Sequence, residues 1–83
     1  MLTPAQTAVL QHLVQVEPTS QNARDVSRQL GLDLPAALRC LHALREGGYA
    51  CYLSESAPVS AGPEDAEHVP TVAGKAYLTT TPL

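Results

Sequence analysis

The stretch LGLDLPAALRCLHALREGGYACYL, residues 30–53, decides the fold of this chain. Leucine and alanine recur there every three or four positions, which predicts a helix over residues 34–46 with one apolar face. Asp33 stands at the N-cap position, and the pair Gly47-Gly48 ends the helix. The segment YACYLS, residues 49–54, alternates and is rich in tyrosine, so it is predicted to be a strand.

A shorter helix is predicted just before this one, over residues 23–30. Asn22 is its expected N-cap, and Gly31 can adopt the left-handed conformation that closes a helix. Only Gly31-Leu32-Asp33 separates the two helices. Two short helices joined by a short turn with glycine are typical of a helix-turn-helix, here over residues 22–46.

The N-terminal segment predicts one more helix, over residues 4–16. Thr3 and Gln6 have the spacing of a capping box, and Pro4 suits the first helical position. Pro18 cannot continue the helix, so the chain must turn there.

The C-terminal half completes the element order. Residues 55–67 carry two prolines, one glycine and four acids, which indicates a loop that we expect to be mobile and solvated. Residues 68–70 are predicted to be a short return strand, and Thr71 is the N-cap of a last helix. The order helix, helix, helix, strand, loop, strand, helix predicts one α+β domain over residues 1–83, with a wing over residues 49–70.

The composition indicates a globular chain with a thin core. Apolar residues make up 45% and charged residues 16%, without Trp or Phe. We expect Tyr49 to join the core and the last helix to pack back through Val72 and Ala76. Tyr77 has two readings, a place in the core or a dimer or partner surface. A homodimer could supply burial that so small a core lacks.

Three segments resemble a known family: VLQHL at residues 9–13, DVSRQLGLDLPAALRCLHALREGGY at 25–49 and VPTVAGKAYL at 69–78. Together they resemble a winged helix-turn-helix domain of bacterial transcriptional regulators of the MarR and PadR type. The resemblance covers residues 3–78. The last segment is similar to the LT-x-x-G element that follows the second wing strand in those regulators, with Pro70 in place of the leucine.

This resemblance implies that the helix over residues 34–46 lies in the major groove of duplex DNA. Base contacts would then fall to Pro35, Ala36, Arg39 and His42, and phosphate contacts to Arg24 and Arg28. Pro35 has no donor and Ala36 offers only a methyl group, so the reading of bases would depend on Arg39 and His42.

The charge distribution keeps a second function open. The net charge is -3, and the second half of the chain holds Lys75 as its one cation. Glu55, Glu64, Asp65 and Glu67 fall where the wing of the family often carries Arg or Lys, and they would repel phosphates. The alternative is a protein-interaction module that does not bind DNA and uses its acidic wing and the apolar surface of helix 34–46.

Metal, cofactor and enzyme functions are not predicted. Cys40, His42, Cys51 and His68 lack the spacing of a zinc site, so we expect both cysteines to be reduced and buried and His68 to be solvated. No glycine-rich phosphate loop occurs, and no nucleophile has a base at suggestive spacing. The sequence contains neither a signal-peptide pattern nor a long apolar run, so we expect a cytoplasmic protein that does not enter the membrane.

Overall fold

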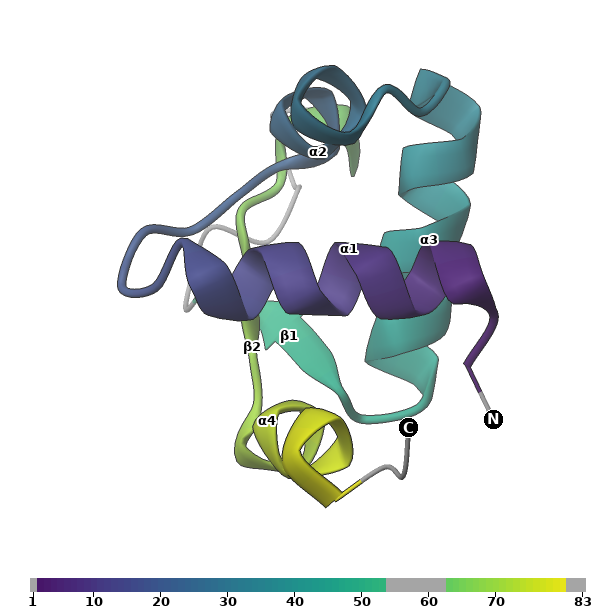
Figure 1. Cartoon of the computed structure of the whole chain (residues 1–83). Helices are drawn as coiled ribbons and strands as arrows, with labels where there is room; N and C mark the ends of the chain where they lie inside the picture. The colour runs from purple at the N-terminus through teal and green to yellow at the C-terminus, as the bar shows by residue number, and fades with distance from the viewer. Residues whose placement is uncertain (1, 54–62, 81–83) are drawn as a thin grey trace.

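The structure is a computed structural model that describes residues 2–53 and 63–80. Its elements follow the predicted order, with an additional 3-10 turn before the second strand (Figure 1). The elements are α1 (Pro4–Gln15), α2 (Ala23–Leu30), α3 (Leu34–Glu46), β1 (Ala50–Tyr52), η1 (Pro63–Asp65), β2 (His68–Pro70) and α4 (Val72–Thr80). In Figure 1, α1 crosses the middle of the molecule, with α2 above it and α4 below it.

The predicted N-caps of α1 and α2 are confirmed by their hydrogen bonds. Thr3 and Gln6 form a reciprocal capping box at the start of α1. Asn22 and Asp25 form a second box at the start of α2, and Gly31 ends that helix with φ +69°. These local signals account for the agreement of the α2 bounds with the predicted ones.

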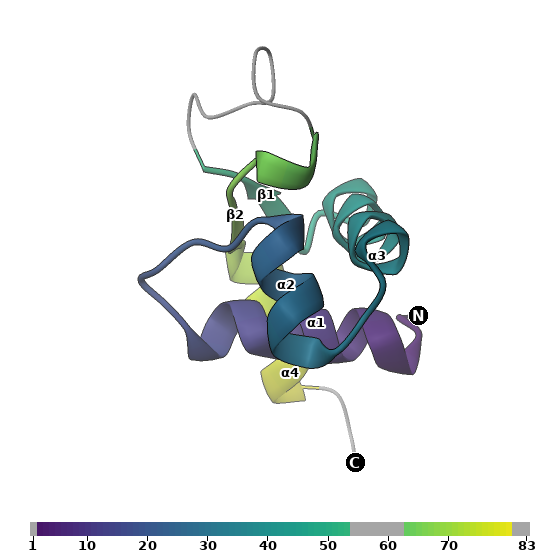
Figure 2. The same ribbon diagram turned by 90° about the horizontal axis from the view of Figure 1, so that it is seen from above.

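The core lies between α1, α2 and α3, and Figure 2 shows how these three helices are arranged. Its largest fully buried apolar side chains come from all three helices: Val9, Leu10, Leu13, Val26, Leu41 and Leu44. The predicted apolar stripe of α3 therefore faces inward, and the opposite side of α3 remains open.

The two strands form a small antiparallel sheet. Ala50 lies opposite Pro70, and Tyr52 lies opposite His68. Gln21, in the segment before α2, forms an isolated bridge with His68, so the base of the wing is joined to the helix-turn-helix. Of the strand predicted over residues 49–54, the structure assigns Ala50–Tyr52 to β1, and the Leu53 amide donates to the Glu67 carbonyl just beyond it; residue 54 lies outside the described residues.

The last helix is held against the start of β1. The Thr71 hydroxyl donates to the Gly48 carbonyl at 2.6 Å and accepts from the Gly74 amide at 3.1 Å, which confirms the predicted cap. Tyr77 packs edge-on against Tyr49, with ring centroids 5.1 Å apart. The expected packing of Val72 and Ala76 is wrong, because both residues are exposed, Val72 to 83% at the first position of α4.

No helix in residues 2–53 or 63–80 is long and apolar enough to cross a membrane.

Candidate nucleic-acid interface

The exposed side of α3 carries the residues predicted to contact bases. Pro35, Arg39 and His42 are exposed and lie four and three positions apart, on the side opposite the buried leucines. Ala36 is half-buried at the edge of this face, which limits it to a contact through its methyl group. The structure therefore brings three of the four predicted base-contact residues onto one open stripe.

His42 is oriented by a neighbour one turn further along the helix. Its Nδ1 lies 3.3 Å from Arg45 Nη2. Because a guanidinium only donates, Nδ1 must accept in this contact, and the proton of the neutral ring is on Nε2. That arrangement leaves His42 with a donor that could bond an acceptor in the groove, such as guanine O6 or N7.

The start of α3 differs from the prediction in one respect. Asp33 occupies the N-cap position, but its side chain accepts no capping hydrogen bond. An N-cap carboxylate bonds the second or third amide of the helix, and Pro35 at the second position has no N–H. The exposed carboxylate of Asp33 thus remains beside the predicted DNA face.

A shallow hollow joins α2 to the start of α3. It has a volume of about 410 Å³ and is lined by Arg24, Ser27, Arg28 and Leu34. The Ser27 hydroxyl donates to the Leu32 carbonyl and so fixes the turn between the helices. Two guanidinium groups one helical turn apart on an open surface are suited to phosphate oxygens.

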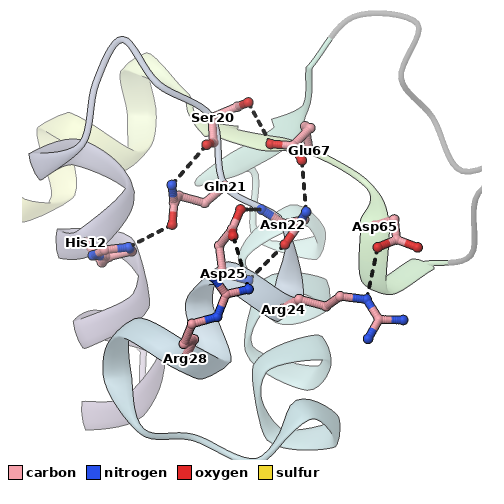
Figure 3. Close-up of polar contacts among 9 residues, drawn as sticks. All are labelled: His12, Ser20, Gln21, Asn22, Arg24, Asp25, Arg28, Asp65 and Glu67. Carbon is pink, nitrogen blue, oxygen red and sulfur yellow. Dashed lines mark hydrogen bonds and ion pairs between the residues drawn. The ribbon is translucent and has the colours of Figure 1, made fainter.

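The two arginines of this hollow differ in how closely acidic side chains pair with them. Arg28 is 72% exposed and lies 3.9 Å from a carboxylate oxygen of Asp25, a distance at which the pairing is weak. Arg24 is engaged more closely: its Nε lies 3.0 Å from Asp65 Oδ1 (Figure 3). Its Nη2 lies 3.7 Å from Glu64 Oε1.

The acidic residues of the wing lie elsewhere than the sequence predicted. Glu64 and Asp65 belong to η1, which packs beside α2, and Glu67 bonds Ser20 and Asn22 (Figure 3). The expectation of a mobile loop is therefore wrong for this last part of residues 55–67, whereas Glu55 lies outside the described residues. The contact between Arg24 and Asp65 spans 41 residues, and no local pattern in the sequence encodes such a pairing.

Arg45 faces inward, toward the base of the wing. Its Nη1 lies 2.6 Å from His68 Nε2, and its guanidinium lies 4.5 Å from the centroid of the Tyr52 ring. Arg45 therefore ties the end of α3 to both strands and is not part of the open face.

His68 is 1% exposed, so the prediction of a solvated side chain is wrong. Its Nδ1 lies 2.9 Å from the Ala66 carbonyl and must donate to it, while Nε2 accepts from Arg45. Residues 68 and 70 of β2 point inward, whereas an alternating pattern in the sequence would place the apolar Val69 inward, so the sequence carried no signal for this burial. Burial lowers the pKa of the His68 imidazole, and Arg45 lowers it further against the opposing effects of the Ala66 carbonyl and Glu67.

This depressed pKa predicts a stability that falls with acidification. Below a pH of about 6.5 the unfolded chain takes up a proton at residue 68, whereas the folded chain keeps the ring neutral to lower pH. We expect the free energy of unfolding to fall between pH 7 and 5, by up to about 1.4 kcal/mol per pH unit from this group. Urea denaturation across that range tests it. His68→Gln should flatten the dependence of the unfolding free energy on pH. Val26→Ala removes no titratable group and should leave that dependence unchanged. If it is also unchanged in His68→Gln, its assignment to His68 is wrong.

The structure does not group Cys40, His42, Cys51 and His68, whose spacing does not fit a zinc site. Cys40 is buried, which raises the pKa of its thiol, whereas Cys51 is exposed, contrary to the expectation that both would be buried. Cys51 alternates with the inward Ala50 and therefore points away from the core. Within residues 2–53 and 63–80, no group of three or more His, Cys, Asp or Glu side chains is placed to hold a metal ion.

Comparison with known proteins finds likeness in structure and not in sequence. The sequence matches no family model and no curated protein. Two solved structures superpose on 90% of this chain: MarR of Staphylococcus aureus in complex with salicylate and kanamycin, with a TM-score of 0.75 at 17% identity, and wild-type apo MarR of E. coli, with a TM-score of 0.71 at 24% identity.

The chain has the winged-helix fold of the MarR regulators. It spans about half the length of those two chains, 46% and 51% respectively. The predicted resemblance and fold class are thereby confirmed. In this winged helix, α2 and α3 are the helix-turn-helix, and the β1–β2 hairpin is the base of the wing.

Proposed function

We propose that the chain is the DNA-binding unit of a bacterial transcriptional regulator, which places α3 in the major groove of duplex DNA. The observation that supports this most is the open stripe of Pro35, Arg39 and His42 beside a hollow with Arg24 and Arg28. In this arrangement Arg39 bonds a guanine and His42 donates from Nε2. Ala36 contacts a thymine methyl, and Arg28 holds a phosphate.

Arg39 is the best placed of these residues. It is exposed at the middle of the stripe and forms no ion pair with another described residue. A guanidinium free of internal partners can offer two parallel donors to O6 and N7 of guanine, the commonest specific contact of this kind. Arg39 therefore carries most of the sequence discrimination in our proposal.

The proposal includes a homodimer that works in the bacterial cytoplasm. Two helix-turn-helix units related by a two-fold axis read the two halves of a palindromic site. The small core, without Trp or Phe, is consistent with further burial at an interface. The exposed Cys51 thiol is consistent with a reducing compartment.

A second candidate function is a protein-interaction module that does not bind DNA. The observation that favours it is the small number of unpaired basic side chains on the proposed DNA-facing side. Arg24 is paired with two acids, and Arg45 faces inward. Leu53, 41% exposed, and Val72 offer apolar surface for a partner.

Titration of a labelled mixed-sequence duplex with the protein, followed by fluorescence anisotropy at low salt, separates the two functions. Binding through α3 predicts a dissociation constant in the micromolar range, typical of contacts to the phosphate backbone. The protein-interaction function predicts no binding.

A further inference from the structure

An acidic segment, residues 64–67, covers the N-terminal turn of α2. Asp65 and Glu64 both approach the Arg24 guanidinium, Asp65 at hydrogen-bonding distance from Nε. Both belong to η1, forty residues or more further along the chain, and Figure 3 shows the contact of Asp65. The contact is therefore tertiary and not a product of helical spacing.

Glu67 adds a second attachment just before α2. Its Oε1 accepts from the Ser20 hydroxyl at 2.7 Å, and its Oε2 accepts from Asn22 Nδ2 at 3.0 Å. Asn22 is itself the N-cap of α2. The acidic segment thus presents carboxylates where the positive end of the helix dipole favours an anion.

The groups that these carboxylates occupy are those that a phosphate would use. Helix N-termini and arginine side chains are the usual protein partners of phosphate oxygens. Arg24 also lines the hollow that it shares with Ser27 and Arg28. Its guanidinium can therefore serve the acidic segment or an anion in the hollow, but not both fully.

We propose that the acidic segment is an autoinhibitory contact, which competes with a DNA phosphate for Arg24 and the start of α2. This inference rests on the proposed function of DNA binding. The side chains of Arg24 and Asp65 are 52% and 44% exposed, and exposed ion pairs are weak. The segment therefore lowers DNA affinity without abolishing it, and a phosphate can displace it.

The test compares two double variants that change the net charge equally. Glu64→Gln with Asp65→Asn removes both partners of Arg24, whereas Glu17→Gln with Glu46→Gln removes two acids that do not contact it. At about 50 mM salt we expect the first variant to bind a labelled duplex three- to tenfold more tightly, with a salt slope steeper by about 0.9 from one more phosphate contact. We expect the control to gain less than about twofold. Addition of Arg24→Ala to the first variant should remove its gain.

Three outcomes overturn proposals, and they can be told apart. If the wild type binds DNA and both double variants gain equally, autoinhibition is wrong while DNA binding stands. The same conclusion follows if the gain survives Arg24→Ala. If no variant binds at about 50 mM salt, both proposals fail.

Discussion

Arg39→Ala is expected to weaken binding to a selected operator duplex by roughly 5- to 150-fold, the range for loss of one bidentate contact to guanine. Arg39 is the exposed guanidinium at the centre of the α3 stripe, and no ion pair with a described residue competes for it. The loss should be largest at one base position, where the variant should no longer distinguish guanine from the other bases. Anisotropy titrations of the operator and of its single-base variants measure both effects.

Two further variants separate base reading from general electrostatics. Lys75→Ala removes one positive charge from α4, where Lys75 pairs with Glu17, and should leave operator affinity within about twofold. Arg28→Ala should weaken all duplexes alike and lower the salt slope by about 0.9. Operator binding that survives Arg39→Ala would refute the assignment of base reading to Arg39. The protein-interaction function predicts instead that no duplex binds and that charge reversal in the acidic wing abolishes partner binding.

Gly74→Ala is expected to destabilise the fold by about 3 kcal/mol, the upper part of the range for an overpacked site. A Cβ at this position would overlap the Tyr49 carbonyl oxygen and would lie 3.0 Å from Leu10 Cδ1. The carbonyl belongs to backbone fixed by its bond from the Thr71 amide, so it cannot move aside cheaply. For a chain of this length, the loss corresponds to a fall in the melting temperature of roughly 12–24 °C.

The sign of this effect distinguishes packing from helix propensity. Propensity alone favours alanine over glycine inside a helix by up to about 1 kcal/mol, so it predicts that Gly74→Ala stabilises. The matched variant Ala73→Gly, at an exposed position of the same helix, should cost about 1 kcal/mol or less. A Gly74→Ala variant that melts at or above the temperature of the wild type would contradict the close packing of α4 against the Tyr49 carbonyl.

The helix-turn-helix could be predicted from the sequence because its signals are local. Asn22 with Asp25 is a capping box, Gly31 requires positive φ, and the apolar stripe of α3 has helical periodicity. Each of these acts within a few residues, so one sequence is enough to place the elements.

The sequence could not show which arginines are paired with other side chains, because these pairs form only in the tertiary structure. Arg24 and Arg45 look alike in the sequence, yet one binds η1 and the other binds His68. Their partners lie 41 and 23 residues away, and only the folded chain brings them together. The sequence therefore overstated the number of free arginines near the proposed DNA face.

The measurement that tests the central claim most directly is anisotropy of a labelled mixed-sequence duplex with wild-type protein at about 50 and 200 mM salt. On a mixed-sequence duplex, where Arg39 has no selected guanine, Arg39 and the weakly paired Arg28 are both expected to contact phosphates. Two such contacts predict micromolar affinity and a slope near 1.8 per bound domain, hence about 12-fold weaker binding at the higher salt. A slope near 3.6 would mean that Arg24 and Arg45 also reach phosphates, against the pairing described above. Absence of binding at 50 mM salt, where electrostatic attraction is strongest, would contradict the proposal that this winged helix binds DNA.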